Sequence, residues 1–83
     1  MAYSISYKTS VQRDLKRLSR DVARRVLDEL ERELSTHAQK CPVLKGEFAG
    51  LRKLRIGDYR VIYAIIGSDV LVLRIGHRKE TYR

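Results

Sequence analysis

The sequence predicts an α+β fold: an N-terminal strand, an antiparallel helical hairpin and then a three-stranded antiparallel meander. Three observations predict it. Residues 3–7 read YSISY and alternate between large side chains and serine, which is the period of a strand with one buried face. Residues 9–34 carry apolar side chains at helical intervals. Residues 51–75 contain three apolar runs joined by short glycine turns, and such turns connect antiparallel neighbours.

Two helices are expected between residues 9 and 34. Their apolar residues recur three or four positions apart: Val11, Leu15 and Leu18 in the first helix, and Val22, Val26, Leu30 and Leu34 in the second. Thr9 or Ser10 is expected to cap the first helix, and Ser19 the second, because these side chains accept a hydrogen bond from a free backbone N–H. The short connection between the helices predicts a hairpin.

A loop and three strands are expected after the helices. Residues 35–50 read as a helix end and a loop, because Pro42, Gly46 and Gly50 interrupt them. Strands are expected at residues 51–56, 59–66 and 70–75, joined by turns at residues 57–58 and 67–69. Both helices then cover one face of a small sheet, and the other face meets water. Residues 1–83 are expected to form one compact domain.

The composition argues against several classes of protein. The single cysteine, Cys41, cannot form a disulfide within the chain. No apolar run is long enough for a signal peptide or a membrane span, so a soluble cytoplasmic protein with no membrane partner is expected. The carboxylates of the second helix lack the spacing of metal ligands, and no metal ion or other cofactor is expected.

The charge is unevenly distributed along the chain. The formal net charge is +8 and the pI is about 10.1. Residues 1–34 hold eight basic and six acidic residues, whereas residues 51–83 hold eight basic and only three acidic ones. A surplus of positive charge in one region attracts polyanions such as nucleic acid. The second half of the chain is therefore the candidate binding region.

The stretch LRKLRIGDYR, residues 51–60, places four of these cations on the predicted sheet. Lys53 and Arg55 lie two apart, so they share one face of their strand. A sheet holds its side chains at fixed separations, which a flexible tail does not. Cations at fixed separations are suited to binding a phosphate group and the transition state of a reaction at that phosphate.

Two stretches, LKGEFAGLRKLRIGDYRVIYAI and VLVLRIGHRKETYR, resemble the RelE/ParE superfamily of bacterial and archaeal toxins. The resemblance extends over the whole chain. It includes the leading strand, the helical hairpin, the loop with Leu44 and Gly46, the basic hairpin, and the arginine and tyrosine near the end. No single piece is specific, but the ordered set at this length is.

The resemblance implies the function of one of two branches. Members of the RelE branch are ribosome-dependent mRNA interferases, which cleave mRNA in the ribosomal A site without a metal ion. The ribose 2′-OH attacks its adjacent phosphodiester, leaving a 2′,3′-cyclic phosphate and a 5′-OH. Members of the ParE branch poison DNA gyrase instead. In both branches a cognate antitoxin binds the toxin and blocks it.

The resemblance also assigns residues. The basic cluster of the RelE type corresponds to Lys53, Arg60 and Arg78, and the C-terminal tyrosine of the family to Tyr82. His77 stands where the family pattern often has a lysine. Leu51 departs from the pattern, because the best-known RelE sequences carry a second lysine there. This departure keeps open a catalytically degenerate homologue that only binds an antitoxin.

The candidate catalytic residues are Lys53, Arg60, His77, Arg78 and Tyr82. Lys53 lies among like charges, which favour its neutral form, so it is the candidate base for the 2′-OH. Arg60 can hold two phosphate oxygens with its planar guanidinium. Arg78 or His77 is the candidate acid, but neighbours on an extended strand face opposite sides, so both cannot face the same phosphate. Tyr82 offers a ring for an unstacked base.

Further cations are predicted to bind RNA, and several partners are expected. The residues expected to contact RNA are Arg52, Arg55, Arg74, Lys79 and Arg83. The expected partners are the ribosome with its RNA, mRNA, and an acidic antitoxin that folds as it binds, forming a heterodimer or heterotetramer. An endoribonuclease is favoured over a gyrase inhibitor, because gyrase inhibition does not need the basic cluster.

Overall fold

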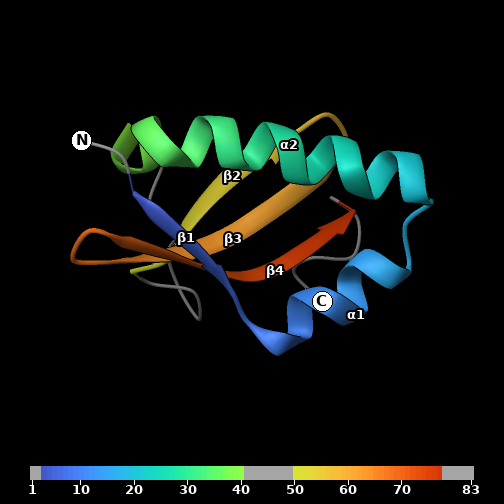
Figure 1. The fold of residues 1–83 in the computed structure, drawn as a ribbon, viewed down its shortest axis with the longest axis horizontal. Coiled ribbons are helices and arrows are strands. Elements are labelled where there is room, and N and C mark those ends of the chain that lie inside the picture. The colour runs from blue at the N-terminus through green and yellow to red at the C-terminus, as the bar shows by residue number, and fades with distance from the viewer. Residues whose placement is uncertain (1–2, 41–49, 78–83) are drawn as a thin grey trace.

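The chain forms a four-stranded sheet with two helices packed on it. The computed structural model describes residues 3–40 and 50–77. The elements, in chain order, are β1 (Ser4–Tyr7), α1 (Thr9–Lys16), α2 (Arg20–His37), the 3-10 helix η1 (Ala38–Lys40), β2 (Arg52–Ile56), β3 (Tyr59–Ile66) and β4 (Asp69–His77). The predicted α+β class and the order of its elements are confirmed. Figure 1 shows that the two helices run in roughly opposite directions, with α2 along the sheet and α1 beside β4.

The order of the strands in the sheet is β1-β4-β3-β2. β2, β3 and β4 form the predicted antiparallel meander. β1 pairs with β4 in the parallel sense, from Ser4 opposite Asp69 to Tyr7 opposite Val72. A parallel pair needs a long connection, and the helices, β2 and β3 supply it. The two strands farthest apart in the sequence therefore lie side by side (Figure 1).

The two hairpin turns are shaped by glycine. Gly57 and Gly67 have φ of +57° and +63°, a region that side chains with a Cβ rarely enter. Each is the first of two turn residues, as in type II′ turns that match the twist of the strands. The second turn is one residue shorter than predicted, because Ile66 already pairs with Asp69. β4 also extends beyond its predicted end, to His77.

The helix caps follow the prediction in α2 and not in α1. The Ser19 Oγ accepts a hydrogen bond from the Val22 N–H at 3.3 Å, as expected for the N-cap of α2. At α1 the prediction of Thr9 or Ser10 is wrong, since Lys8 holds the N-cap position without a side-chain cap. The Ser10 hydroxyl instead donates to the Leu73 carbonyl of β4 at 2.8 Å.

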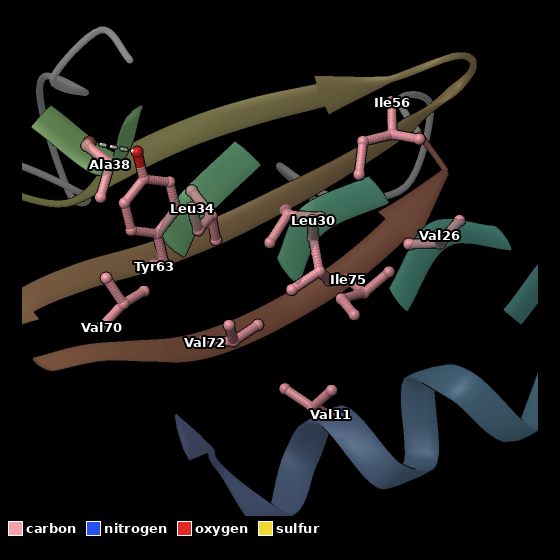
Figure 2. Close-up of a cluster of buried hydrophobic side chains, with 11 residues drawn as sticks. Val11, Val26, Leu30, Leu34, Ala38, Ile56, Tyr63, Val70, Val72 and Ile75 are labelled. Atoms are coloured by element: carbon pink, nitrogen blue, oxygen red, sulfur yellow. Dashed lines mark hydrogen bonds between the residues drawn. The ribbon is translucent and has the colours of Figure 1, made fainter. Parts of the chain in front are cut away.

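The core lies between the helices and one face of the sheet (Figure 2). Its buried residues come from every layer: Val11 of α1, Val26, Leu30 and Leu34 of α2, Ile56 of β2, Val61 and Tyr63 of β3, and Val70, Val72 and Ile75 of β4. The alternation in β1 is confirmed, since Tyr3 and Ile5 pack against this core and Ser4 and Ser6 are exposed. Full burial of such a side chain contributes about 1.5–3 kcal/mol, so this layer carries most of the stability.

A β-bulge divides β4 into two halves with opposite phase. Val72 lies opposite Tyr63, but Arg74 lies opposite Ile62, so Leu73 is an extra residue on β4. Before the bulge the even-numbered residues Val70 and Val72 face the helices. After it the odd-numbered residue Ile75 does. The bulge therefore turns Arg74 to the opposite face of the sheet.

The end of β1 and the helix α1 supply the hydrogen-bond partners of β4 around this bulge. β1 pairs with β4 only as far as Val72. The Lys8 N–H then donates to the Val72 carbonyl at 2.9 Å, and Ser10 bonds the Leu73 carbonyl. The Ile75 N–H donates to Oδ2 of Asp14 at 2.9 Å. An edge that would otherwise expose its backbone is thus closed by the Lys8 N–H and by side chains of α1.

Removing the buried Tyr63 hydroxyl tests how much η1 contributes to the fold. This hydroxyl donates to the Ala38 carbonyl at 2.6 Å in a fully buried setting (Figure 2). Tyr63→Phe is expected to lower the free energy of unfolding by about 1 kcal/mol, because the carbonyl loses a buried partner. Urea denaturation measures the change.

Tyr7→Phe is the matched control for this substitution. The Tyr7 hydroxyl donates to Glu31 at 2.6 Å in an exposed setting. Partial burial, followed by this bond and the charge of Glu31, raises the pKa of Tyr7 above its ordinary value. The free energy of unfolding is expected to fall less in Tyr7→Phe than in Tyr63→Phe. Equal decreases in the two variants would contradict a special role for the bond to Ala38.

Candidate nucleic-acid interface

The sheet face opposite the helices, here called the open face, carries a cluster of cations. Its residues on the three meander strands include Lys53 and Arg55 of β2, Arg60 and Ile62 of β3, and Arg74 and Gly76 of β4. The expectation that this face meets water holds at Arg55 and Arg74 but not at Ile62, which is fully buried. These residues face away from the core because each alternates with a core residue such as Leu54, Val61 or Ile75. The predicted shared face of Lys53 and Arg55 is thereby observed.

The pairing of the strands arranges these residues in two rows. Lys53, Ile62 and Arg74 lie opposite one another across the three strands. Arg55, Arg60 and Gly76 form the adjacent row. Lys53 and Arg60 are therefore diagonal neighbours, with backbones about 7–8 Å apart. The sheet holds their backbones at this separation, and both side chains are half-buried, which restricts their motion.

Two of the predicted residues lie on the other side of the sheet. Arg52 lies opposite Tyr63, and its Nη1 donates to the Gln39 carbonyl at 3.0 Å. His77 lies opposite Tyr59, and the two rings meet edge to face with centroids 5.6 Å apart at 83°. The structure does not bring either residue together with Lys53 and Arg60. Arg78, Lys79, Tyr82 and Arg83 lie outside the described residues.

Arg74 is held in place by a carboxylate that the sequence analysis did not select. Its Nε donates to Asp14 Oδ2 at 3.1 Å, and the same oxygen accepts the Ile75 N–H. Asp14 is only 7% exposed and is the buried charged residue among those the structure describes. The available signal was its position three residues after Val11, within the apolar stripe of α1. An acid at a core position usually has a specific partner.

The described residues contain neither a metal-binding cluster nor a membrane-spanning helix. Within 3–40 and 50–77, no group of three His, Cys, Asp or Glu side chains is placed to hold a metal ion. No helix in that part of the chain has the length and apolar character needed to span a membrane.

A four-stranded sheet with two helices packed on it in this order is the fold of the toxins of the RelE/ParE superfamily. Residues 5–82 match the family described as the ParE toxin of the type II toxin–antitoxin system, parDE. The chain belongs to this family and is a toxin of a type II toxin–antitoxin system.

Three relatives illustrate the similarity, all from Mycobacterium tuberculosis. Toxin RelG is 31% identical over 86 residues, which cover 100% of this chain and 99% of RelG. Toxin RelE is 30% identical over 84 residues, which cover 98% of this chain and 87% of that toxin. A chain in the crystal structure of the toxin–antitoxin complex RelBE2 matches with a TM-score of 0.88 at 29% identity, covering 96% of this chain and 95% of that chain.

Proposed function

We propose that this toxin is a ribosome-dependent endoribonuclease that cleaves mRNA in the A site. The observation that carries the proposal is the common position of Lys53, Arg55 and Arg60 on the open face, with Arg74 on the neighbouring strand. Cations held close together stabilise the charge that gathers on a phosphate during cleavage. The similarity to toxins RelG and RelE supports the same assignment.

The proposed reaction begins with Lys53 as the base. Lys53 takes the proton of the ribose 2′-OH, and the freed oxygen forms a bond to the adjacent phosphorus. Arg60 holds the non-bridging oxygens, where negative charge increases. The bond from phosphorus to the 5′ oxygen then breaks, which leaves a 2′,3′-cyclic phosphate and, after protonation, a 5′-OH. The reaction uses no metal ion or other cofactor.

The group that assists the leaving 5′ oxygen is proposed to belong to the C-terminal segment and not to be His77. His77 lies on the helix side of the sheet, against Tyr59, whereas Lys53 and Arg60 are on the open face. Arg78 is therefore the proposed group at the 5′ oxygen, and Tyr82 is proposed to stack on the splayed base. A guanidinium holds its proton tightly, so Arg78 is proposed to stabilise the negative charge of the 5′ oxygen while a water molecule beside it gives that oxygen a proton. The hydroxide that remains then takes the proton that Lys53 removed from the 2′-OH, which restores both groups.

The proposed inhibitor is an acidic antitoxin that folds as it binds and covers the open face. The formal charge of +8 favours an acidic partner. The similar RelBE2 structure is itself a toxin–antitoxin complex. A heterodimer or a heterotetramer is proposed, with the ribosome as the target of the released toxin in the cytoplasm.

Induced expression tests the proposal directly. Expression is expected to stop growth and to produce cuts in a reporter mRNA at codon spacing, detected by primer extension. In a purified system the cuts are expected only when ribosomes are present. Lys53→Ala and Arg78→Ala should each restore growth and remove the cuts. If both variants remain fully toxic, the assignment of the site is wrong.

The family match favours one alternative, the poisoning of DNA gyrase, because residues 5–82 match a family described by ParE. That function predicts DNA damage after induction and an intact reporter mRNA. Leu51, where the best-known RelE pattern has a lysine, leaves open a further alternative: a degenerate homologue that binds an antitoxin without toxicity. The same induction experiment separates all three outcomes.

A further inference from the structure

The solvent side of α1 carries a row of cations, here called the α1 stripe: Arg13, Lys16 and Arg17. These residues are three and four positions apart, so they project from one side of the helix. Arg17 is the C-cap and has helical dihedrals, φ −80° and ψ −12°, so it continues the row. All three are exposed, whereas Val11 and Asp14 on the opposite side are buried.

Within the residues that the structure describes, no carboxylate forms an ion pair with the α1 stripe. The ion pairs within residues 3–40 and 50–77 join Arg25 to Glu29, His37 to Glu33 and Arg74 to Asp14. Asp14, the acid closest in sequence, is buried and already accepts two hydrogen bonds. Cations near a helix C-terminus gain about 0.3–1 kcal/mol from the helix dipole, but this does not require three on one side of a two-turn helix.

A depression of about 300 Å³ lies between the end of α1, the start of β3 and the end of β4. Asp14 lines it from α1, Arg17 and Leu18 from the residues that follow α1, and Arg74 and Gly76 from β4. The paired rings of Tyr59 and His77 contribute aromatic surface. This volume is at the small end of the range for ligand sites. Aromatic rings beside guanidinium groups are the combination that binds an unpaired base and its phosphate.

Arg74 links the depression to the open face. It lies in one row with Lys53 and Ile62 across the sheet, and it also lines the depression. Its Nε is bonded to Asp14, and its side chain is 54% exposed, so the rest of the guanidinium is accessible. Arg74, paired with Asp14, therefore lies at the edge of β4 between the open face and the depression.

We propose that the α1 stripe and the depression form a second RNA-binding surface, separate from the site of cleavage. One nucleotide occupies the depression, with its base against the rings and its phosphate at Arg17, and the backbone of ribosomal RNA or mRNA follows the stripe. The proposal takes its ligand class, RNA, from the proposed function. The surface contributes affinity for the RNA and takes no part in bond cleavage.

Binding to ribosomes tests this surface. The variant Arg13→Gln/Lys16→Gln/Arg17→Gln removes three exposed charges, and Arg24→Gln/Arg25→Gln/Arg32→Gln on α2 is the control with the same loss of charge. The probe is purified ribosomes carrying an mRNA with 2′-deoxy nucleotides in the A site, which cannot be cleaved. The dissociation constant is measured between 50 and 200 mM KCl, and circular dichroism confirms that both variants are folded.

The α1 variant is expected to bind about tenfold or more weakly than the control at 100 mM KCl. The slope of log affinity against log salt concentration should also be smaller in magnitude by about 2 for the α1 variant. Each lost phosphate contact lowers the magnitude of this slope by about 0.7. Its cleavage rate on saturating ribosomes carrying normal mRNA should match that of the wild type, with only KM raised.

Three results would overturn the proposal: equal ribosome binding by the two variants, loss of antitoxin binding alone in the α1 variant, or a wild type that binds no ribosomes. The proposed function fails in a different way. If the wild type binds ribosomes but cuts no mRNA, and the α1 variant binds weakly, cleavage is refuted and the RNA-binding surface stands.

Discussion

Arg60→Ala is expected to reduce the rate of mRNA cleavage by about 100-fold or more, and so to abolish toxicity. Loss of a fixed group that stabilises developing charge typically costs a factor of about 100–1000. Arg60 meets this description, because it lies diagonally from Lys53 on a sheet and is half-buried. The effect should appear at saturating ribosome concentration, since the interaction strengthens in the transition state.

Single-turnover cleavage of ribosome-bound mRNA measures this effect. Arg60→Lys should be intermediate, because it keeps the charge and loses the planar pair of donors. Arg52→Ala is the informative comparison: Arg52 is one residue from Lys53, yet its guanidinium bonds the Gln39 carbonyl on the helix side. This variant should retain cleavage. Equal losses in Arg52→Ala and Arg60→Ala would show that total charge matters and the open face does not.

Asp14→Ala is expected to lower the free energy of unfolding by about 3 kcal/mol. The substitution leaves the buried Ile75 N–H without its acceptor and removes the charged partner of Arg74. A buried donor without an acceptor costs about 1–3 kcal/mol, and bonds to charged groups lie at the upper end. An 83-residue domain has little stability to spare, so the melting temperature should fall by more than about 10 °C.

Urea denaturation of three variants separates the contributions to this loss. Asp14→Asn keeps an oxygen that can accept from Ile75, so it should lose about 1–2 kcal/mol. Arg74→Ala should lose less than 1 kcal/mol, because its side chain is 54% exposed and water replaces the ion pair. If Arg74→Ala were as destabilising as Asp14→Ala, the ion pair and not the backbone bond would hold α1 to β4.

Asp14 also matters for the geometry of the open face. Together with Ser10 it bonds the backbone of β4 on both sides of Arg74. The bulge at Leu73 is what turns Arg74 to the open face and His77 to the helix side. Loosening this attachment should disturb both residues. The stability and the binding surfaces of this toxin therefore depend on the same contact between α1 and β4.

Local patterns in the sequence predict the helices and strands and most of their buried faces. The helical intervals of Val22, Val26, Leu30 and Leu34 predicted the buried stripe of α2, and the glycine turns predicted the meander. The two-residue period placed Lys53 and Arg55 on one face, where the structure has them. These features depend on each residue's neighbours within one element, so the local pattern is sufficient to predict them.

Three features depend on contacts between distant segments: the pairing of β1 with β4, the sides of the sheet that Arg74 and His77 face, and the bonds of Asp14 to β4. Strict alternation from Val70 and Val72 would have turned Arg74 toward the helices and His77 to the open face. The extra residue in β4 reverses both, and α1, about 60 positions earlier in the chain, holds that arrangement. Such pairings are fixed by packing and hydrogen bonds between distant segments, and no periodicity within either segment encodes them.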